Sequence, residues 1–400
     1  MPLDIETPLP YQRDSACPFD PGPRLRQAQR EGPMHRYRLP NGQDIWVVTR
    51  YDEVRQMFTD PRLSSALTPL TLMLPGLGDD QLEVSPGSFV NMDPPEHTRL
   101  RRTVTSSFTA RRLRELTPRL ERIAENCLDG MEETGPPADF MTAFASPFPL
   151  LAICELLGLT DAERDEFIAL TGKAAAGLAA TPEEAKDLVD HAHRFMLGIV
   201  TAQRADPRDG MIGMLVAEHG DELTDEEIVG ISNMFLSAGF DTTANTIGLG
   251  LLALLDNPDQ LALLRDDPAV LDTAVEELMR YLSVISATSG RTATEDLELG
   301  GVTVKAGEYV VPALAVANRD PAHYADPDRL DLTRPPGQQV GFGYGVHRCT
   351  GATMALLELK IAFSALLRRF PGIRLAVPRE ELAFRGYTMV HGALGIPVVW

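Results

Sequence analysis

The residues 342–351 combine glycines with cysteine, histidine and arginine, and together they could form a metal-thiolate site. They read Phe-Gly-Tyr-Gly-Val-His-Arg-Cys-Thr-Gly and precede a predicted helix over 352–369. Glycine lets a loop pass close to another group, and the start of a helix favours a thiolate at Cys349. A buried thiolate needs a counter-charge, so its natural partner is a metal ion. A lone cysteine is more often an inert core residue, but the glycines, His347 and Arg348 argue against that interpretation.

A second group of polar residues interrupts a long apolar helix. Thr224 and Glu227 form a capping box. The apolar pattern that follows predicts a helix over 225–255, about 46 Å long at roughly 1.5 Å per residue. Its middle, 238–243, reads Ala-Gly-Phe-Asp-Thr-Thr. A glycine inside a helix costs about 1 kcal/mol, and buried polar groups cost more unless they are paired. The pattern indicates either a local hydrogen-bonded kink or a groove for a small ligand and a proton path.

The elements that must position these residues are mainly helical. Asn41 and Gly42 supply the turn of a predicted β-hairpin within 37–49. Short strands are expected again over 297–316, where glycines punctuate the chain. Helical periodicity dominates between these segments, for example over 111–133 and 161–175. Length alone suggests two or three domains, but no linker or repeat divides the chain, so we expect one mainly α domain with small β-sheets over residues 1–400.

Composition excludes several classes of function. The chain has 37 basic and 57 acidic residues, a net charge of −20, which disfavours binding to nucleic acid and to anionic membranes. No apolar run is long enough to span a membrane, and the first residues do not resemble an export signal. Four cysteines lie far apart in the sequence, which argues against a zinc cluster or a disulfide framework. We therefore expect a cytoplasmic protein.

Three motifs resemble those of the cytochrome P-450 superfamily. The residues 342–351 resemble its haem-binding loop, whose cysteine is the axial iron ligand. The stretch 238–243 resembles its oxygen-activating segment, and Glu277 with Arg280 resembles its E-x-x-R pair. The likeness extends over nearly the whole chain and is closest to soluble bacterial members that oxidise natural products. It implies a single-domain, mainly α fold with a long central helix over the haem.

The resemblance implies haem b as the cofactor, with Cys349 as the iron ligand. The residues at matching positions contact the haem or its propionates; they are His97, Arg101, Arg291, Phe342, Gly343, His347 and Gly351. Two arginines and two histidines suit the two carboxylates of a haem. From the sequence itself, Asp93 is expected to cap a helix with Pro94 at its first position. His97 and Arg101 then share one face of that helix, where without the resemblance they could equally be solvated.

The activity implied is insertion of one oxygen atom from O2 into an apolar small molecule. A secondary metabolite, as in antibiotic biosynthesis, is the expected substrate, and hydroxylation or epoxidation the expected reaction. Asp241 and Thr242 are expected to deliver protons, whereas Glu277 and Arg280 are expected to support the fold. Two alternatives stay open: an atypical oxidation such as desaturation, aryl coupling or peroxide-driven chemistry, and a haem-binding protein without catalysis.

A ferredoxin, supplied by a ferredoxin reductase, is the electron donor that the resemblance implies. The stretch 97–114 contains six arginines and no acidic residue, and Arg348 lies beside the cysteine. A cationic surface of this kind suits an acidic ferredoxin. The same arginines could instead form an ordinary solvated helix face.

Substrate contacts are expected from three regions, and each could equally be ordinary core. The positions are Leu72, Met73, Phe89, Phe235, Ala238, Gly239, Val284, Ala287 and Met389. The chain departs from the family pattern at Thr350, Gln339 and Leu356, where leucine or isoleucine, histidine and arginine are commoner. None of the three is the expected ligand, so the haem assignment stands.

Overall fold

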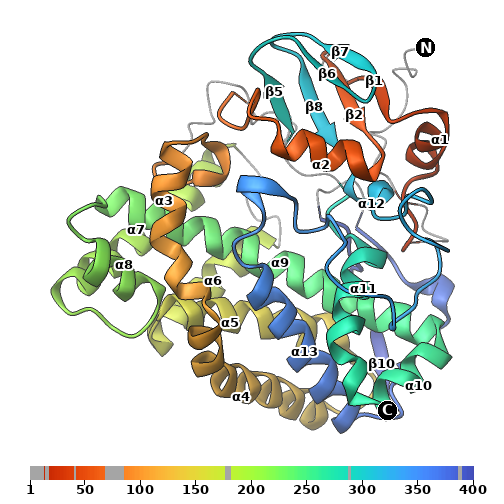
Figure 1. Ribbon diagram of the computed structural model, residues 1–400. Helices are drawn as coiled ribbons and strands as arrows, with labels where there is room; N and C mark the ends of the chain where they lie inside the picture. The colour runs from red at the N-terminus through yellow and green to blue at the C-terminus, as the bar shows by residue number, and fades with distance from the viewer. Residues whose placement is uncertain are drawn as a thin grey trace. The chain divides into compact units, whose positions relative to one another are not determined.

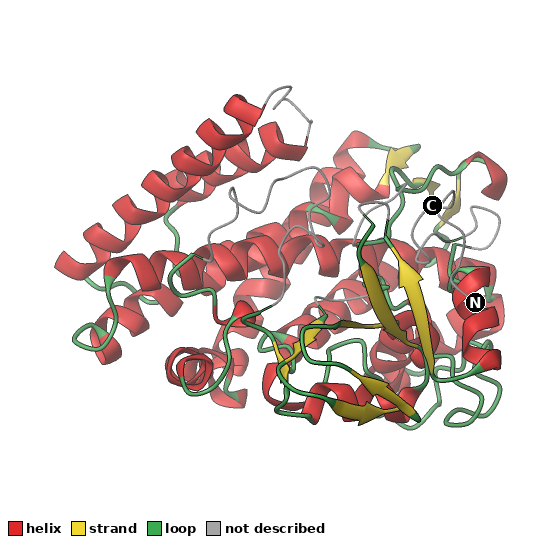
Figure 2. Cartoon of the chain, turned by 90° about the horizontal axis from the view of Figure 1, so that it is seen from above, coloured by secondary structure: helices red, strands yellow, loops and turns green. Residues whose placement is uncertain are grey.

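Helices make up most of the chain in the computed structural model, and the strands are short (Figures 1 and 2). The structure describes Arg13 and residues 18–39, 42–67, 85–175, 182–286, 290–385 and 390–400. Two compact units are present. Unit 1 comprises Met1–Leu82, Ala124–Pro147 and Asp241–Trp400, and unit 2 comprises Glu83–Ile123 and Phe148–Phe240. The expectation of one domain over residues 1–400 stays a prediction.

The largest sheet belongs to unit 1 and has five strands in the order β1-β2-β8-β5-β3. They are β1 (Met34–Arg38), β2 (Asp44–Val48), β8 (Tyr309–Pro312), β5 (Arg291–Ala293) and β3 (Leu63–Ser64). β1 and β2 pair antiparallel with Met34 opposite Val48, which confirms the predicted hairpin. Gly42 has a φ of +85°, as its turn requires, and Asn41 lies outside the described residues. β2 pairs with β8 in parallel, with Trp46 opposite Val310.

Two smaller sheets complete the strands described in unit 1. One has the order β4-β10-β9 and the other pairs β6 with β7. The strands are β4 (Ala138–Asp139), β10 (Pro397–Val399), β9 (Arg374–Leu375), β6 (Leu297–Leu299) and β7 (Val302–Val304). β6, β7 and β8 confirm the strands predicted over 297–316, although the last residues of that range form the short helix α12 (Leu314–Ala317).

The helices that lie wholly in unit 1 include the one that follows the cysteine loop. They are α1 (Pro23–Glu31), α2 (Tyr51–Thr59), α10 (Pro258–Asp266), α11 (Leu271–Leu282), α12 and α13 (Ala352–Arg369), with the short turns η5 (Met141–Ala145), η6 (Pro268–Val270), η7 (Gly345–His347) and η8 (Arg379–Glu381). On α2, Val54, Met57 and Phe58 have the three-and-four spacing of one helix face. They share a buried cluster with Val48 and Val310 of the sheet. α11 and α13 lie side by side (Figure 1).

Unit 2 is built from helices throughout its described residues. Those lying mainly in it are α3 (Glu96–Val104), α5 (Pro147–Leu157), α6 (Asp161–Ala175), α7 (Pro182–Ala205) and α8 (Met211–His219), with the turns η3 (Phe89–Asn91) and η4 (Thr105–Phe108). α7 contacts both α6 and α8, and Met196, Ile199, Ile212 and Leu215 are buried on these helices. α4 (Ala110–Thr134) and α9 (Asp225–Asp256) contribute residues to both units.

The long helix α9 confirms the sequence prediction almost residue for residue. It spans Asp225–Asp256, one residue beyond the predicted end. The capping box is formed as expected: the Thr224 backbone N–H donates to Glu227 Oε2 at 2.9 Å, and the Glu227 N–H donates to Thr224 Oγ1 at 3.2 Å. Within the described chain, no single helix is long and apolar enough to cross a membrane, although α9 and α10 together, bent by 109°, meet the criteria of length and composition.

Candidate functional site

The cysteine loop is a tight turn at the start of α13. The Cys349 backbone N–H donates to the Phe342 carbonyl at 2.8 Å, closing the loop on itself. Gly345 has a φ of +71°, and a Cβ there would lie 2.6 Å from the Phe58 carbonyl oxygen of α2. Glycine is therefore required at 345 both by its backbone angle and by the close approach of α2. Gly351 is the N-cap residue of α13, so Cys349 lies just outside the helix N-terminus, as the sequence predicted.

Cys349 differs in burial from the other cysteines that the structure describes. Its side chain is exposed, whereas Cys154 is buried and Cys127 is partly buried. Burial raises the pKa of Cys154 to about 12 and that of Cys127 to about 11, so both remain protonated thiols at neutral pH. No group of three or more His, Cys, Asp or Glu in the described part of the chain could hold a metal ion. A thiolate at Cys349 is a suitable single ligand for a metal that a cofactor holds.

Two predicted haem contacts lie around α2 in unit 1. Phe58 contacts the cysteine loop at Gly345, and its ring centroid is 5.9 Å from the Arg291 guanidinium. Arg291 is 6% exposed and donates to the Gly290 carbonyl at 2.9 Å. His347 Nε2 shares a hydrogen bond of 3.0 Å with the Ser65 hydroxyl. The structure thus places Arg291 and the loop that carries His347 near the same residue of α2, Phe58, while their role toward a haem remains a prediction.

The polar residues of α9 form a hydrogen-bonded cluster within an unbroken helix. Asp241 accepts two hydrogen bonds of 2.8 Å from Arg385, one at each carboxylate oxygen. Asn245 donates to the Asp241 carbonyl at 2.7 Å and to its carboxylate at 3.0 Å. The Thr246 hydroxyl donates to the Thr242 carbonyl at 2.8 Å. The helix runs without a break from Asp225 to Asp256, and the side chains of Asp241 and Asn245 are hydrogen-bonded within it.

Neither Asn245 nor Arg385 was predicted from the sequence. Asn245 lies four residues after Asp241, a spacing that places two side chains on one helix face, and this signal could have found it. Arg385 is 144 residues from Asp241 and lies in an irregular segment. No local pattern points to it.

The predicted haem contacts of unit 2 lie on α3. His97 is 1% exposed, and its ring packs edge-on against Phe89 with centroids 5.9 Å apart. Arg101 follows one turn later and is partly buried. The prediction that Asp93 caps this helix is wrong, because α3 begins at Glu96 with Pro95 as its N-cap residue. A proline disfavours helical angles in the residue before it, so the helix cannot include Pro94.

The predicted substrate positions lie in unit 2, in unit 1 or outside the described residues. Phe89 and Phe235 are buried together in unit 2, with ring centroids 6.4 Å apart, and Phe108 packs on Phe235 at 5.2 Å. Gly239 lies close to α5, since a Cβ there would be 3.1 Å from Ile153 Cδ1.

Val284, in unit 1, is buried and its carbonyl accepts from the His391 N–H at 2.8 Å. Ala238 is exposed on α9. The positions that lie outside the described residues are Leu72, Met73, Ala287 and Met389.

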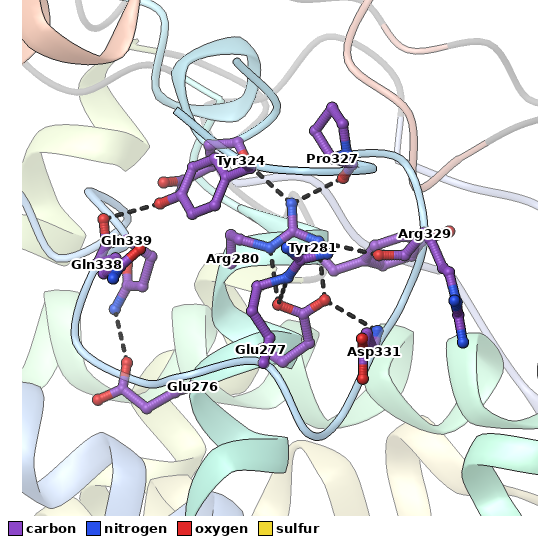
Figure 3. A network of polar contacts seen from close by, with 12 residues as sticks. Glu276, Glu277, Arg280, Tyr281, Tyr324, Pro327, Arg329, Asp331, Gln338 and Gln339 are labelled. Atoms are coloured by element: carbon purple, nitrogen blue, oxygen red, sulfur yellow. Dashed lines mark hydrogen bonds and ion pairs between the residues drawn. The ribbon is translucent and has the colours of Figure 1, made fainter. Parts of the chain in front are cut away.

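Glu277 and Arg280 form the centre of a buried network that leads to the segment before the cysteine loop (Figure 3). Glu277 accepts from Arg280 at 2.7 and 2.8 Å, from Arg334 Nε at 3.1 Å and from the Asp331 N–H at 3.0 Å. Arg280 also donates to the carbonyls of three residues in the chain that precedes the loop, namely Asn318, Pro327 and Arg329. The predicted pairing is confirmed, and Arg334 is a third member that the sequence did not reveal.

The departure from the family pattern at Gln339 has a local explanation. Gln339 donates to Glu276 at 3.2 Å and accepts from the Gly341 N–H at 2.6 Å, so its amide holds the chain ahead of the loop. Leu356 is partly buried on α13, and one turn later Lys360 forms an ion pair of 2.5 Å with Asp272 of α11. Nothing in the structure explains Thr350.

The arginine-rich stretch 97–114 is more neutralised than its sequence indicates. Arg99 pairs with Glu96 and Glu227, and Arg112 pairs with Asp209. The acidic partners come mostly from distant parts of unit 2, which is why the stretch reads as purely basic in sequence. Arg102 keeps 70% of its side chain exposed, with Glu222 3.6 Å away, and Arg114 is exposed.

Known proteins resemble this chain over nearly its whole length. The family model for cytochrome P-450 matches residues 167–374. Pentalenic acid synthase of Streptomyces avermitilis is 37% identical over 99% of this chain and 98% of its own. Mycinamicin IV hydroxylase/epoxidase of Micromonospora griseorubida is 37% identical over 94% and 95%.

The crystal structure of OxyC, implicated in an oxidative C–C coupling during vancomycin biosynthesis, covers 98% of this chain and 97% of its own, with 36% identity and a TM-score of 0.88. The chain therefore belongs to the cytochrome P-450 family. It is a monooxygenase with haem b as its cofactor, and its fold is the mainly α fold expected from the sequence.

Proposed function

We propose that this enzyme inserts one oxygen atom from O2 into an apolar secondary metabolite by hydroxylation or epoxidation. The position of Cys349 in a closed, glycine-containing loop at the start of α13 is the observation that carries the proposal. The relatives named for hydroxylation, epoxidation and pentalenic acid synthesis support the class of substrate. A haem with an axial thiolate supplies an electron-rich iron that promotes cleavage of the O–O bond.

In this proposal Cys349 is the iron ligand, and basic residues hold the two haem carboxylates. Arg291 and His347 are the candidates in unit 1, and His97 and Arg101 are those in unit 2. Charge-assisted hydrogen bonds from such side chains are about twice as strong as neutral ones. The residues that would line the loop beside the cofactor are Phe342, Gly343 and Gly351.

Asp241 and Thr242 are proposed as the proton relay. The Asp241 side chain is 29% exposed, so water can reach its carboxylate. It can take a proton there and pass it to the hydroxyl of the neighbouring Thr242, whose own proton moves on toward the reacting oxygen. Once one proton has passed through, the Asp241 carboxylate and the Thr242 hydroxyl are both back in their starting states.

Electrons are proposed to come from a ferredoxin, itself reduced by a ferredoxin reductase. Arg102 and Arg114 remain exposed in the stretch 97–114, and Arg348 is exposed beside the cysteine. Exposed arginines attract an acidic partner and speed its encounter, and salt weakens this effect.

The substrate side of the proposal rests on the apolar positions. Phe89 and Phe235 are buried against each other in unit 2, and Val284 is buried in unit 1. Apolar and aromatic side chains of this kind line the sites that bind apolar ligands. Aryl coupling is the second candidate reaction, favoured by the likeness to OxyC.

Replacing Cys349 tests the proposal directly. Cys349→Ala should abolish the carbon monoxide spectrum typical of a thiolate-bound haem, because the strong donor to iron is lost. Cys127→Ala is the matched control and should retain the parent spectrum, since its thiol is held protonated. An unchanged spectrum in Cys349→Ala would refute the assignment of the ligand.

A further inference from the structure

Arg385 holds the Asp241 carboxylate in one fixed orientation. Its two terminal nitrogens each lie 2.8 Å from a different carboxylate oxygen, which is the bidentate geometry of an arginine fork. Asn245 donates a third hydrogen bond to the same carboxylate at 3.0 Å. Three directed donors leave the Asp241 side chain little rotational freedom.

The segment that carries Arg385 is itself locked against α9. The Arg385 N–H donates to the Gly392 carbonyl at 2.8 Å, and the Leu394 N–H donates to the Ala383 carbonyl at 2.8 Å. Gly392 abuts the Asn245 carboxamide so closely that a Cβ at 392 would lie 1.6 Å from its oxygen. Asn245 is fully buried, so this contact fixes the position of Gly392 along the axis of α9. The described residues 382–385 and 390–394 thus hold Arg385 beside α9.

Structural stability alone does not account for the arrangement. Both side chains are 29% exposed, and a partly exposed ion pair contributes little to stability. The same exposure lets water contact the carboxylate while Arg385 keeps it in place. A proton acceptor that is both hydrated and fixed is what the entrance of a proton path requires.

The other titratable side chain in the described residues 382–385 and 390–394 does not compete for protons. His391 stacks on Phe384 with centroids 5.9 Å apart. Burial, together with the charges of Arg13 and Arg385, lowers the pKa of His391 to about 3, so it is neutral at physiological pH.

We propose that Arg385 is a positioning residue of the proton relay, and that protons enter the relay at the Asp241 carboxylate on the side of α9 where Arg385 lies. This inference rests on the proposed role of Asp241 and Thr242. Asp241 takes a proton from hydronium, leaving water, and passes it to the Thr242 hydroxyl as that hydroxyl gives up its own. Arg385 exchanges no proton and acts only through the orientation of the carboxylate.

The test compares Arg385→Gln, Arg385→Lys and Arg379→Gln in the haem-loaded enzyme. Arg379 is the matched control, because it also joins a segment after α13 to an aspartate of α9, Asp256, at 3.2 Å. Arg385→Gln should lower the product formed per reductant consumed severalfold and raise the solvent isotope effect, with haem content unchanged. Arg385→Lys should recover part of the loss, since it restores the charge but not the fork. Arg379→Gln should match the parent, and equal behaviour of Arg385→Gln and Arg379→Gln would overturn the proposal.

A double-mutant cycle with Asp241→Asn combines a rate with a readout that does not depend on turnover, the urea midpoint of unfolding. If Arg385 acts through Asp241, the double variant should be no slower than Asp241→Asn alone. Its urea midpoint should likewise fall no further than that of Arg385→Gln. Additive losses in rate and midpoint would contradict the inference about Arg385. Full turnover with a normal isotope effect in Asp241→Asn would instead refute the proposed relay itself, so the two failures are distinguishable.

Discussion

Removing the carboxylate of Glu277 should destabilise the protein strongly. The side chains of Glu277 and Arg280 are 1% and 2% exposed, so neither charge can be solvated if its partner is lost. Glu277→Ala would remove the acceptor for two N–H groups of Arg280, one of Arg334 and the backbone N–H of Asp331. Arg280 would then remain as a buried cation with only carbonyl partners.

The expected loss follows from that arrangement. Breaking a buried ion pair by removing one partner costs about 3–5 kcal/mol. The entropy of unfolding is about 2.1 cal/mol/K per residue, or about 0.84 kcal/mol/K for 400 residues. The melting temperature of Glu277→Ala should therefore fall by about 4–6 °C. Haem retention should fall with it, because Arg280 holds the carbonyls of the chain leading to the cysteine loop.

Thermal unfolding followed by circular dichroism, with haem absorbance read in parallel, measures both effects. Asp272→Asn is the matched control, since Asp272 lies on the same helix and its ion pair with Lys360 is largely exposed. An exposed pair contributes about 0–1 kcal/mol, so this variant should melt within about 1 °C of the parent. If Glu277→Ala melted like Asp272→Asn, the reasoning from burial would be refuted.

Four further predictions address the relay, the core and the docking surface. Thr242→Ala should keep its haem and still consume reductant, but release more hydrogen peroxide, as a peroxide assay would show; unchanged coupling would place the relay elsewhere. Burial raises the pKa of Glu358 well above its ordinary value, so the folded state binds more protons than the unfolded state. The free energy of unfolding should therefore fall by up to about 1.4 kcal/mol per pH unit as the pH rises past the unfolded pKa. Glu358→Gln should remove this loss, and a melting curve against pH that kept the parent slope would contradict it. Gly392→Ala should cost about 1–3 kcal/mol in urea denaturation because its methyl group collides with the buried Asn245 amide. Arg102→Glu should slow reduction by ferredoxin in a salt-dependent manner while substrate binding is kept, and rates equal to the parent at all ionic strengths would exclude Arg102 from docking.

Local signals account for the parts of the molecule that the sequence predicted well. The start of α9 depends on Thr224 and Glu227, which are three residues apart and satisfy each other's backbone N–H groups. The cysteine loop depends on glycines whose need for positive φ is readable from the residue type. The capping box and the backbone angles of the loop glycines are local features, and a sequence pattern captures these directly.

The features missed from the sequence depend on long-range pairing. Arg385 reaches Asp241 across 144 residues, and Arg334 reaches Glu277 across 57. Arg112 is neutralised by Asp209, which is 97 residues away. Counting charges along the chain does not identify such partners, because tertiary packing determines which acidic residue pairs with each arginine.

Because the described cysteines differ in burial, thiol labelling can measure the fraction of the enzyme that carries its cofactor. Thiol-reactive dyes attack the thiolate, and Cys127 and Cys154 are held as thiols by burial. In a Cys17→Ser background, dye incorporation should therefore report Cys349 alone among the remaining cysteines. Because a thiolate bound to iron cannot also react with a dye, the labelled fraction would measure the haem-free enzyme in any preparation.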